Sequence, residues 1–162
     1  MAELELTRTA EDRRLFALEG VGTLRLEGWG SPRATAETGV RSWHFARRGY
    51  WRRGIDATDA FGGMAGTFEP ARKRRGGALH WVDDDLVLRP ASMWRERYAL
   101  ADGDRELVVL DSKDWGKRPL RVTVEDLDEI DPGLLLFATF VVRGLTVETG
   151  AAAAAAAGAT SA

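Results

Sequence analysis

One apolar segment, 132–145, constrains the fold of this chain more than any other part of the sequence. Asp131 suits a helix N-cap, because its carboxylate can accept the unpaired backbone N–H groups of a first turn. Pro132 suits the first helical position, where its missing N–H costs nothing, and Gly144 offers a stop. The apolar side chains cover nearly the whole circumference of a helix. The sequence therefore predicts a helix buried on every side, although the β-branching of 137–142 also fits a strand.

Before this segment, apolar residues alternate with polar or small residues through most of the first 125 positions. Alternation of this kind is typical of strands that bury one face. Turn residues, mostly Gly, Pro, Asp and Ser, separate the alternating stretches at short intervals. The stretches predict about twelve short strands, which contain Leu4/Leu6, Leu15–Leu18, Leu24/Leu26, Ala34/Ala36, Trp43/Phe45, Ile55/Ala57, Gly63–Phe68, Leu79/Trp81, Leu86/Leu88, Tyr98/Leu100, Leu107–Leu110 and Leu120/Val122/Val124.

The predicted fold is mainly β: a closed antiparallel barrel of about twelve strands around a central C-terminal hydrophobic helix. Closure surrounds the helix with apolar side chains and leaves no exposed sheet edge. We expect one domain over residues 1–148. Residues 149–162 contain seven consecutive alanines and are expected to form a disordered tail, because a short uncapped alanine run with nothing to pack on is marginal as a helix. A docked helix is the alternative.

The absence of cysteine excludes disulfides, thiolate nucleophiles and cysteine-ligated metal sites. The acidic N-terminal residues lack the basic and apolar regions of a signal peptide. The longest apolar stretch, Leu134–Val142, is far shorter than the roughly 20 residues of a membrane-spanning helix. We therefore expect a cytoplasmic protein that is not transmembrane and that is either free or peripheral to a membrane.

No catalytic motif is present, and we expect neither an enzyme nor a cofactor. The serines do not lie in a nucleophile elbow, and no phosphate-binding glycine motif precedes a helix. His44 and His80 each adjoin a tryptophan in a strand, without the spacing of a metal site. The acidic runs 83–85 and 102–104 are typical of hairpin turns, with calcium binding as the sharper alternative. Most of the six tryptophans are expected to fill the space between barrel and helix.

The net charge of −2 gives no reason to expect nucleic acid as a partner, but the charge is uneven along the chain. Residues 41–75 hold nine Lys/Arg and three Asp/Glu, whereas residues 102–131 hold ten Asp/Glu and five Lys/Arg. These segments form either solvated faces or an anion-facing side. The candidate contacts for an anion or lipid are Arg47, Arg48, Trp51, Arg52, Arg53, Arg72, Lys73, Arg74 and Arg75.

The order of elements, about twelve strands and then an apolar helix that opens with residues 131–136, resembles the tubby C-terminal-like superfamily. This superfamily includes the plant LURP-one-related proteins and the phospholipid scramblases. Within it, residues 43–49 and 97–104 look most like those of short bacterial members. The resemblance covers about residues 3–147 and implies a twelve-stranded barrel with a non-enzymatic role at phosphoinositides or membrane surfaces. The cysteine-rich palmitoylation segment of the scramblases has no counterpart here.

Three functional hypotheses follow. The first is a non-enzymatic binding or scaffold domain that contacts anionic phospholipid, or a protein, through its basic residues. The second is a structural subunit or interaction module of a larger assembly, in which acidic and basic sides of different copies pair. The third is a small-molecule enzyme or carrier with a pocket near His44 or His80. A barrel filled by its own helix argues against the third, because it leaves no internal ligand cavity.

Overall fold

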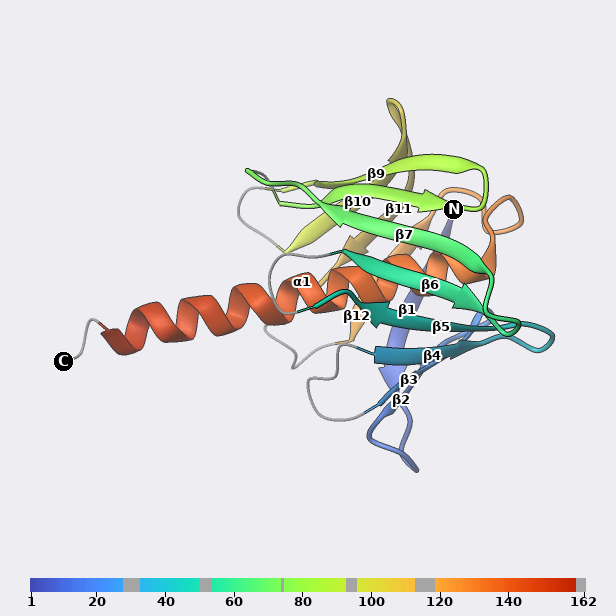
Figure 1. The fold of residues 1–162 in the computed structure, drawn as a ribbon, viewed down its shortest axis with the longest axis horizontal. Helices are drawn as coiled ribbons and strands as arrows, with labels where there is room; N and C mark the ends of the chain where they lie inside the picture. Colours follow the sequence, from blue (N-terminus) through green and yellow to red (C-terminus); the bar gives the residue numbers. More distant parts are fainter. Residues whose placement is uncertain (28–32, 50–53, 74, 93–95, 113–118, 160–162) are drawn as a thin grey trace.

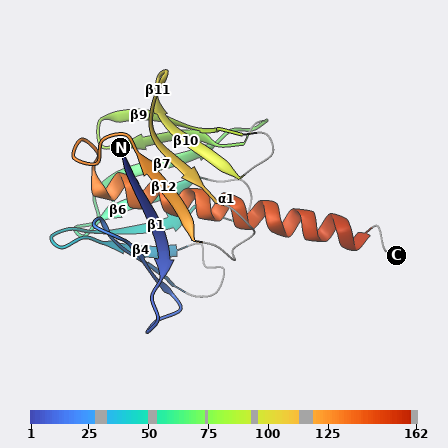
Figure 2. The same cartoon turned by 180° about the vertical axis from the view of Figure 1, so that it is seen from behind.

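In the computed structural model, an antiparallel barrel surrounds one helix (Figure 1). The structure describes residues 1–27, 33–49, 54–73, 75–92, 96–112 and 119–159, without the side chains of 147–157 and 159. Each strand pairs with the next one along the chain, and β12 pairs with β1, which closes the barrel; Figure 2 shows these two strands side by side. The strands are β1 Ala2–Arg8, β2 Leu15–Leu18, β3 Gly22–Leu26, β4 Arg33–Glu37, β5 Ser42–Arg47, β6 Ile55–Asp59, β7 Met64–Pro70, β8 Gly77–Trp81, β9 Asp84–Pro90, β10 Arg97–Asp102, β11 Arg105–Asp111 and β12 Leu120–Val124. The predicted closed twelve-stranded barrel is confirmed.

The alternation in the sequence corresponds to the two faces of the barrel wall. In β8, for example, Gly77, Leu79 and Trp81 are buried, whereas Ala78 and His80 are exposed. Successive side chains of a strand point to opposite faces, so each predicted apolar pair lies on the inner face. Every strand contributes such inward side chains, and together with the helix they form one hydrophobic core.

The helix α1 (Pro132–Ala159) begins where the sequence predicts. The backbone N–H of Gly133 donates to Oδ1 of Asp131 at 2.7 Å, and the N–H of Leu135 donates to the Asp131 carbonyl at 3.1 Å. Asp131 is therefore the N-cap, and it satisfies donors that a helix start leaves unpaired.

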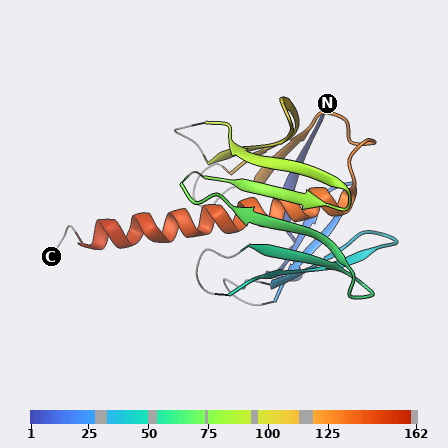
Figure 3. The same cartoon turned by 45° about the horizontal axis from the view of Figure 1, so that its top comes forward.

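The first part of α1 runs along the inside of the barrel, as Figure 3 shows, and Leu134–Val142 are all buried. The ring of Phe137 lies 5.1 Å from that of Phe45 and 5.6 Å from that of Trp81, measured between centroids. The one polar side chain of this stretch, Thr139, donates to the Leu135 carbonyl at 2.7 Å. Burial of this hydroxyl therefore leaves no donor unpaired.

Beyond the barrel, the structure differs from the predicted tail. The helix was expected to end near Leu145, yet it continues to Ala159 and projects out of the barrel (Figure 1). The prediction treated the alanines as an isolated segment that must nucleate its own helix. They instead extend a helix that the core has already nucleated, and alanine has the highest helix propensity of all residues. No helix in the described part of the chain is both long enough and apolar enough to cross a membrane.

Candidate functional site

The topology divides the loops of the barrel between two ends. Connections that follow the odd-numbered strands lie at the end where α1 leaves the barrel, which we term the helix-exit end. Connections that follow the even-numbered strands lie where α1 begins, at the helix-start end. By sequence, the helix-exit connections contain thirteen Lys/Arg and five Asp/Glu, whereas the helix-start connections contain one Arg and eight Asp/Glu. By sequence, the connections at one end of the barrel are therefore mainly basic and those at the other end mainly acidic.

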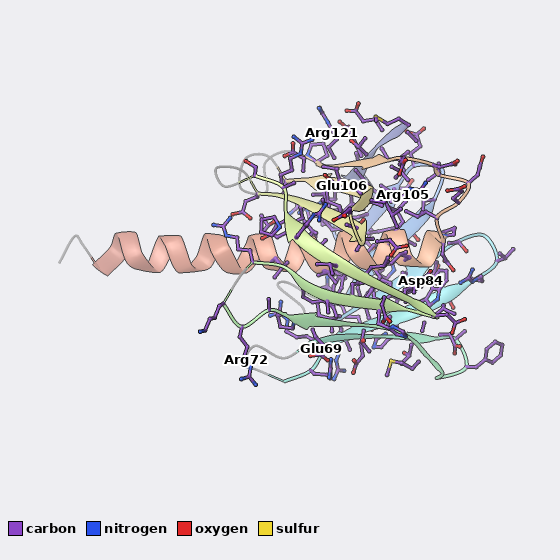
Figure 4. The ribbon with its side chains drawn as sticks, turned by 90° about the horizontal axis from the view of Figure 1, so that it is seen from above. Glu69, Arg72, Asp84, Arg105, Glu106 and Arg121 are labelled. Atoms are coloured by element: carbon purple, nitrogen blue, oxygen red, sulfur yellow. The ribbon has the colours of Figure 1, made fainter. Side chains whose placement is uncertain are left out.

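Five of the nine candidate residues predicted from the sequence are described by the structure, and they lie at the helix-exit end. Arg47 ends β5, Arg48 follows it, and Arg72, Lys73 and Arg75 lie in the connection from β7 to β8. Figure 4 shows Arg72 at the side of the barrel from which α1 projects, with Asp84 toward the other side. The remaining four, Trp51, Arg52, Arg53 and Arg74, lie outside the described residues.

Two of these predicted cations are already paired within the chain. The guanidinium of Arg48 donates to Glu69, and its Nε lies 3.0 Å from Oδ1 of Asp56. The hydrogen bond to Glu69 raises the pKa of Arg48, despite some opposing desolvation. Arg75 is looser, with its Nη1 3.5 Å from an oxygen of Glu96. The charge of Arg48 is therefore compensated within the barrel wall, so this side chain is less suited to bind an external anion.

Arg72 and Lys73 differ from Arg48. Both are exposed, and neither has an acidic partner among the residues that the structure describes. Their charges are therefore exposed to solvent and uncompensated within the described part of the chain.

A second basic group, of which only Arg47 belongs to the predicted set, lies where α1 leaves the barrel. The guanidinium carbon of Arg143 lies 5.0 Å from the ring centroid of Phe16, and that of Arg8 lies 5.5 Å from the same centroid. These are cation–π distances. Burial lowers the pKa of Arg143, and the nearby positive charge of Arg8 lowers it further. Within the described residues, no carboxylate pairs with either guanidinium.

Arg47 completes this group on another side of the helix. A Cβ atom built on Gly144 would lie 3.3 Å from Nη2 of Arg47, so this guanidinium lies against α1 one residue after Arg143. We term Arg8, Arg47 and Arg143 the arginine collar. One signal in the sequence could have found it, because Arg143 is the sole charged residue between Asp131 and Glu148.

The two histidines do not form a common site. Both lie on the outer face of the barrel, and strands β6 and β7 separate β5, which carries His44, from β8, which carries His80. Nδ1 of His44 lies 3.5 Å from Glu27, and Nδ1 of His80 lies 2.6 Å from Oδ1 of Asp85. Within the described residues, no three potential ligands cluster closely enough to hold a metal ion.

Comparisons of the chain with family models, with curated proteins and with solved structures gave no match.

Proposed function

We propose that this chain is a non-enzymatic binding domain whose helix-exit end contacts the phosphates of an anionic phospholipid surface. The observation that carries the proposal is the pair Arg8 and Arg143, two guanidiniums that both lie against the Phe16 ring without a carboxylate partner in the described part of the chain. Two like charges held together are unfavourable until an anion lies between or beside them. Guanidinium groups bind phosphate well because their N–H donors match its oxygens.

The surrounding loops extend this site over the same end. Arg72 and Lys73 add exposed charge, and each Lys or Arg near an anionic membrane contributes roughly 1 kcal/mol to binding. By sequence, the helix-exit connections also contain four tryptophans, Trp29, Trp51, Trp94 and Trp115, all of which lie outside the described residues. Tryptophan is enriched at membrane–water interfaces. Charge and residue type both favour a flat anionic surface as the partner.

The packed interior supports a binding role over an enzymatic or carrier role. The side chains of Leu135, Phe137 and Val141 are fully buried inside the barrel, where a ligand would otherwise sit. We also propose membership of the tubby C-terminal-like superfamily, supported by the order of twelve strands and one core helix. In that superfamily, a phosphoinositide or membrane-surface role without catalysis is the expected one.

Liposome co-sedimentation tests this proposal. The test variant combines Arg72→Ser, Lys73→Ser and Arg75→Ser, three exposed or half-exposed cations of the helix-exit end. We expect wild type to sediment with vesicles that contain phosphatidylserine, but not with phosphatidylcholine alone. Loss of three cations is expected to weaken this binding by about 100-fold, at roughly 1 kcal/mol for each. A second variant, Arg143→Gln, is expected to weaken it further.

The control variant removes the same number of positive charges from cations that already pair with carboxylates of the barrel wall. Arg89, Arg105 and Arg121 lie in strands of the barrel wall, where each pairs with Glu side chains (Figure 4 labels the last two). The triple change of these residues to Ser is expected to leave most of the sedimentation intact. The proposal fails if the two triple variants sediment equally, or if wild type binds neutral and anionic vesicles alike.

A second candidate function, a structural subunit of an assembly, is favoured by the opposite charges of the two barrel ends. The basic end of one copy would then meet the acidic end of the next. The mass in solution at low and high salt tests this candidate. A monomer at low salt and high concentration would exclude it, because screening weakens charge pairing only as salt rises.

A further inference from the structure

Exposed apolar side chains gather at the helix-start end. Val40 is 92% exposed, Phe61 98%, Met64 62% and Val82 56%. These four account for most of the large apolar residues that the described part of the chain exposes, and all four line one groove of about 680 Å³. Clustered apolar exposure on a soluble domain marks a contact site more often than scattered exposure does. We term this the apolar groove; the buried Trp43 and Trp81 also line it.

Hydrogen-bonded turns present these side chains in fixed positions. The backbone N–H groups of Phe61 and Gly63 each donate to Oδ1 of Asp59 at 2.9 Å, and these two hydrogen bonds fix the turn between β6 and β7. In the turn between β4 and β5, the N–H of Thr38 donates to the carbonyl of Arg41 at 2.8 Å. Rigid turns lose little entropy when a partner binds, so they favour recognition.

The backbone at Val82 is strained. Its φ is +54°, in the left-handed region that β-branched residues rarely adopt. Its N–H donates to the Ala65 carbonyl at 2.8 Å, so the turn between β8 and β9 is well ordered. Strain of this kind is concentrated at functional sites. Here it holds an apolar side chain on the rim of the groove, where glycine or asparagine would suit the backbone better.

The charge beside the groove determines which partner fits. A smaller hollow of about 260 Å³ adjoins it, lined by the carboxylates of Asp84, Asp102, Glu125, Asp126, Glu129 and Asp131. Arg105 also lines this hollow and binds two of the carboxylates, Glu125 at 3.1 Å and Glu129 at 3.3 Å. The pair Arg41–Asp131, at 3.1 Å, joins the rims of the groove and the hollow. Apolar and acidic recognition surfaces are therefore neighbours.

We propose that the helix-start end binds a segment of a partner protein in which a bulky apolar residue adjoins Lys or Arg. The apolar side chain occupies the groove between Val40 and Phe61, and the basic side chain lies toward the carboxylates of the hollow. The excess of acidic over basic residues at this end selects a cationic partner and disfavours an acidic one. This inference is independent of the lipid contact, which lies at the opposite end of the barrel.

A displayed library of random heptapeptides, selected on the intact protein, tests the proposal. We expect enriched sequences in which an aromatic or large aliphatic residue stands beside Lys or Arg. The most enriched heptapeptide is then synthesised, and its binding is measured by fluorescence anisotropy at low and high salt. The double variant Val40→Ser/Phe61→Ser is expected to bind it at least about tenfold more weakly, as loss of an apolar anchor usually does. Both residues are exposed, so the fold should persist, which circular dichroism checks.

Two further variants separate the parts of the site. Val87→Ser removes another exposed apolar residue, 48% exposed on β9 and outside the groove, and should leave the affinity unchanged. Asp126→Asn/Glu129→Gln should weaken binding and reduce its salt dependence. Enrichment of acidic peptides, or equal enrichment on Val40→Ser/Phe61→Ser, would overturn the proposal. So would self-association of wild type that this double variant abolishes, since the groove would then hold a second copy.

Discussion

Replacement of Gly133 by alanine tests whether the start of α1 is as tightly enclosed as the structure shows. A Cβ atom at this position would lie 2.5 Å from Cζ2 of Trp43 and 2.6 Å from Cζ2 of Trp81. Ordinary contacts between carbon atoms are about 3.5–4.0 Å. Both rings are buried, and Trp81 is enclosed from another side, because a Cβ on Gly66 would lie 2.5 Å from its Cε3. The rings therefore have little room to move.

The expected cost follows from these distances. Overpacking of a well-packed core costs about 1–3 kcal/mol, and two rigid contacts place this change near the upper limit. Alanine in place of glycine recovers about 1 kcal/mol of helix propensity. The free energy of unfolding is thus expected to fall by about 2 kcal/mol. For a chain of 162 residues this corresponds to a decrease in Tm of roughly 4–8 °C.

Urea denaturation followed by far-UV circular dichroism measures this change, with Gly144→Ala as the matched control in the same helix. At Gly144 the new Cβ meets only the end of the flexible Arg47 side chain, at 3.3 Å. The control is expected to raise stability by about 0.5–1 kcal/mol. Equal effects of the two substitutions, or an unchanged stability of Gly133→Ala, would refute the enclosure of the helix start.

Three other substitutions test individual contacts. Asp131→Ala removes the N-cap and should lower the free energy of unfolding by about 1 kcal/mol in urea denaturation; an unchanged midpoint would contradict this role. Val82→Asn relieves the left-handed strain and should raise the free energy of unfolding by about 1 kcal/mol, measured as a higher Tm; a lower Tm would show that the Val82 side chain stabilises the fold. The hydrogen bond to Asp85 raises the pKa of His80, so Asp85→Asn should lower that pKa in an NMR titration. Because folding raises the pKa of His80, the contribution of this bond to stability is fully present below the pKa of the unfolded state and is lost as pH rises through the pKa of the folded state. An identical titration curve in both proteins would exclude the bond.

The sequence predicted the fold because its signals are local. Alternation places Leu24 and Leu26 on one face without knowledge of the neighbouring strands, and Asp131 and Pro132 mark the helix start by themselves. The predicted helix end near Leu145 was wrong because the residues after it extend a helix that the core has already nucleated, and their local sequence does not show this support.

The candidate sites were predictable only in part, because they depend on closure of the barrel. Arg8 and Arg143 are far apart in the sequence and meet over Phe16 only when β1, β2 and the end of the buried helix come together. Charge counted along the chain also misleads in an antiparallel meander. Arg41 was counted with the basic segment, yet it lies at the acidic helix-start end, since successive connections alternate between the two ends.

The position of α1 after all twelve strands has a consequence for biosynthesis. The wall of the barrel is translated first, and the residues that fill it, Leu134–Val142, are translated after all twelve strands. The pairing that closes the wall, β1 with β12, likewise joins strands from opposite ends of the domain. Long-range pairing makes folding slow, and nascent strands expose apolar faces while they wait. The core is therefore expected to form only after the helix has been synthesised, and the apolar faces of the wall stay exposed until then.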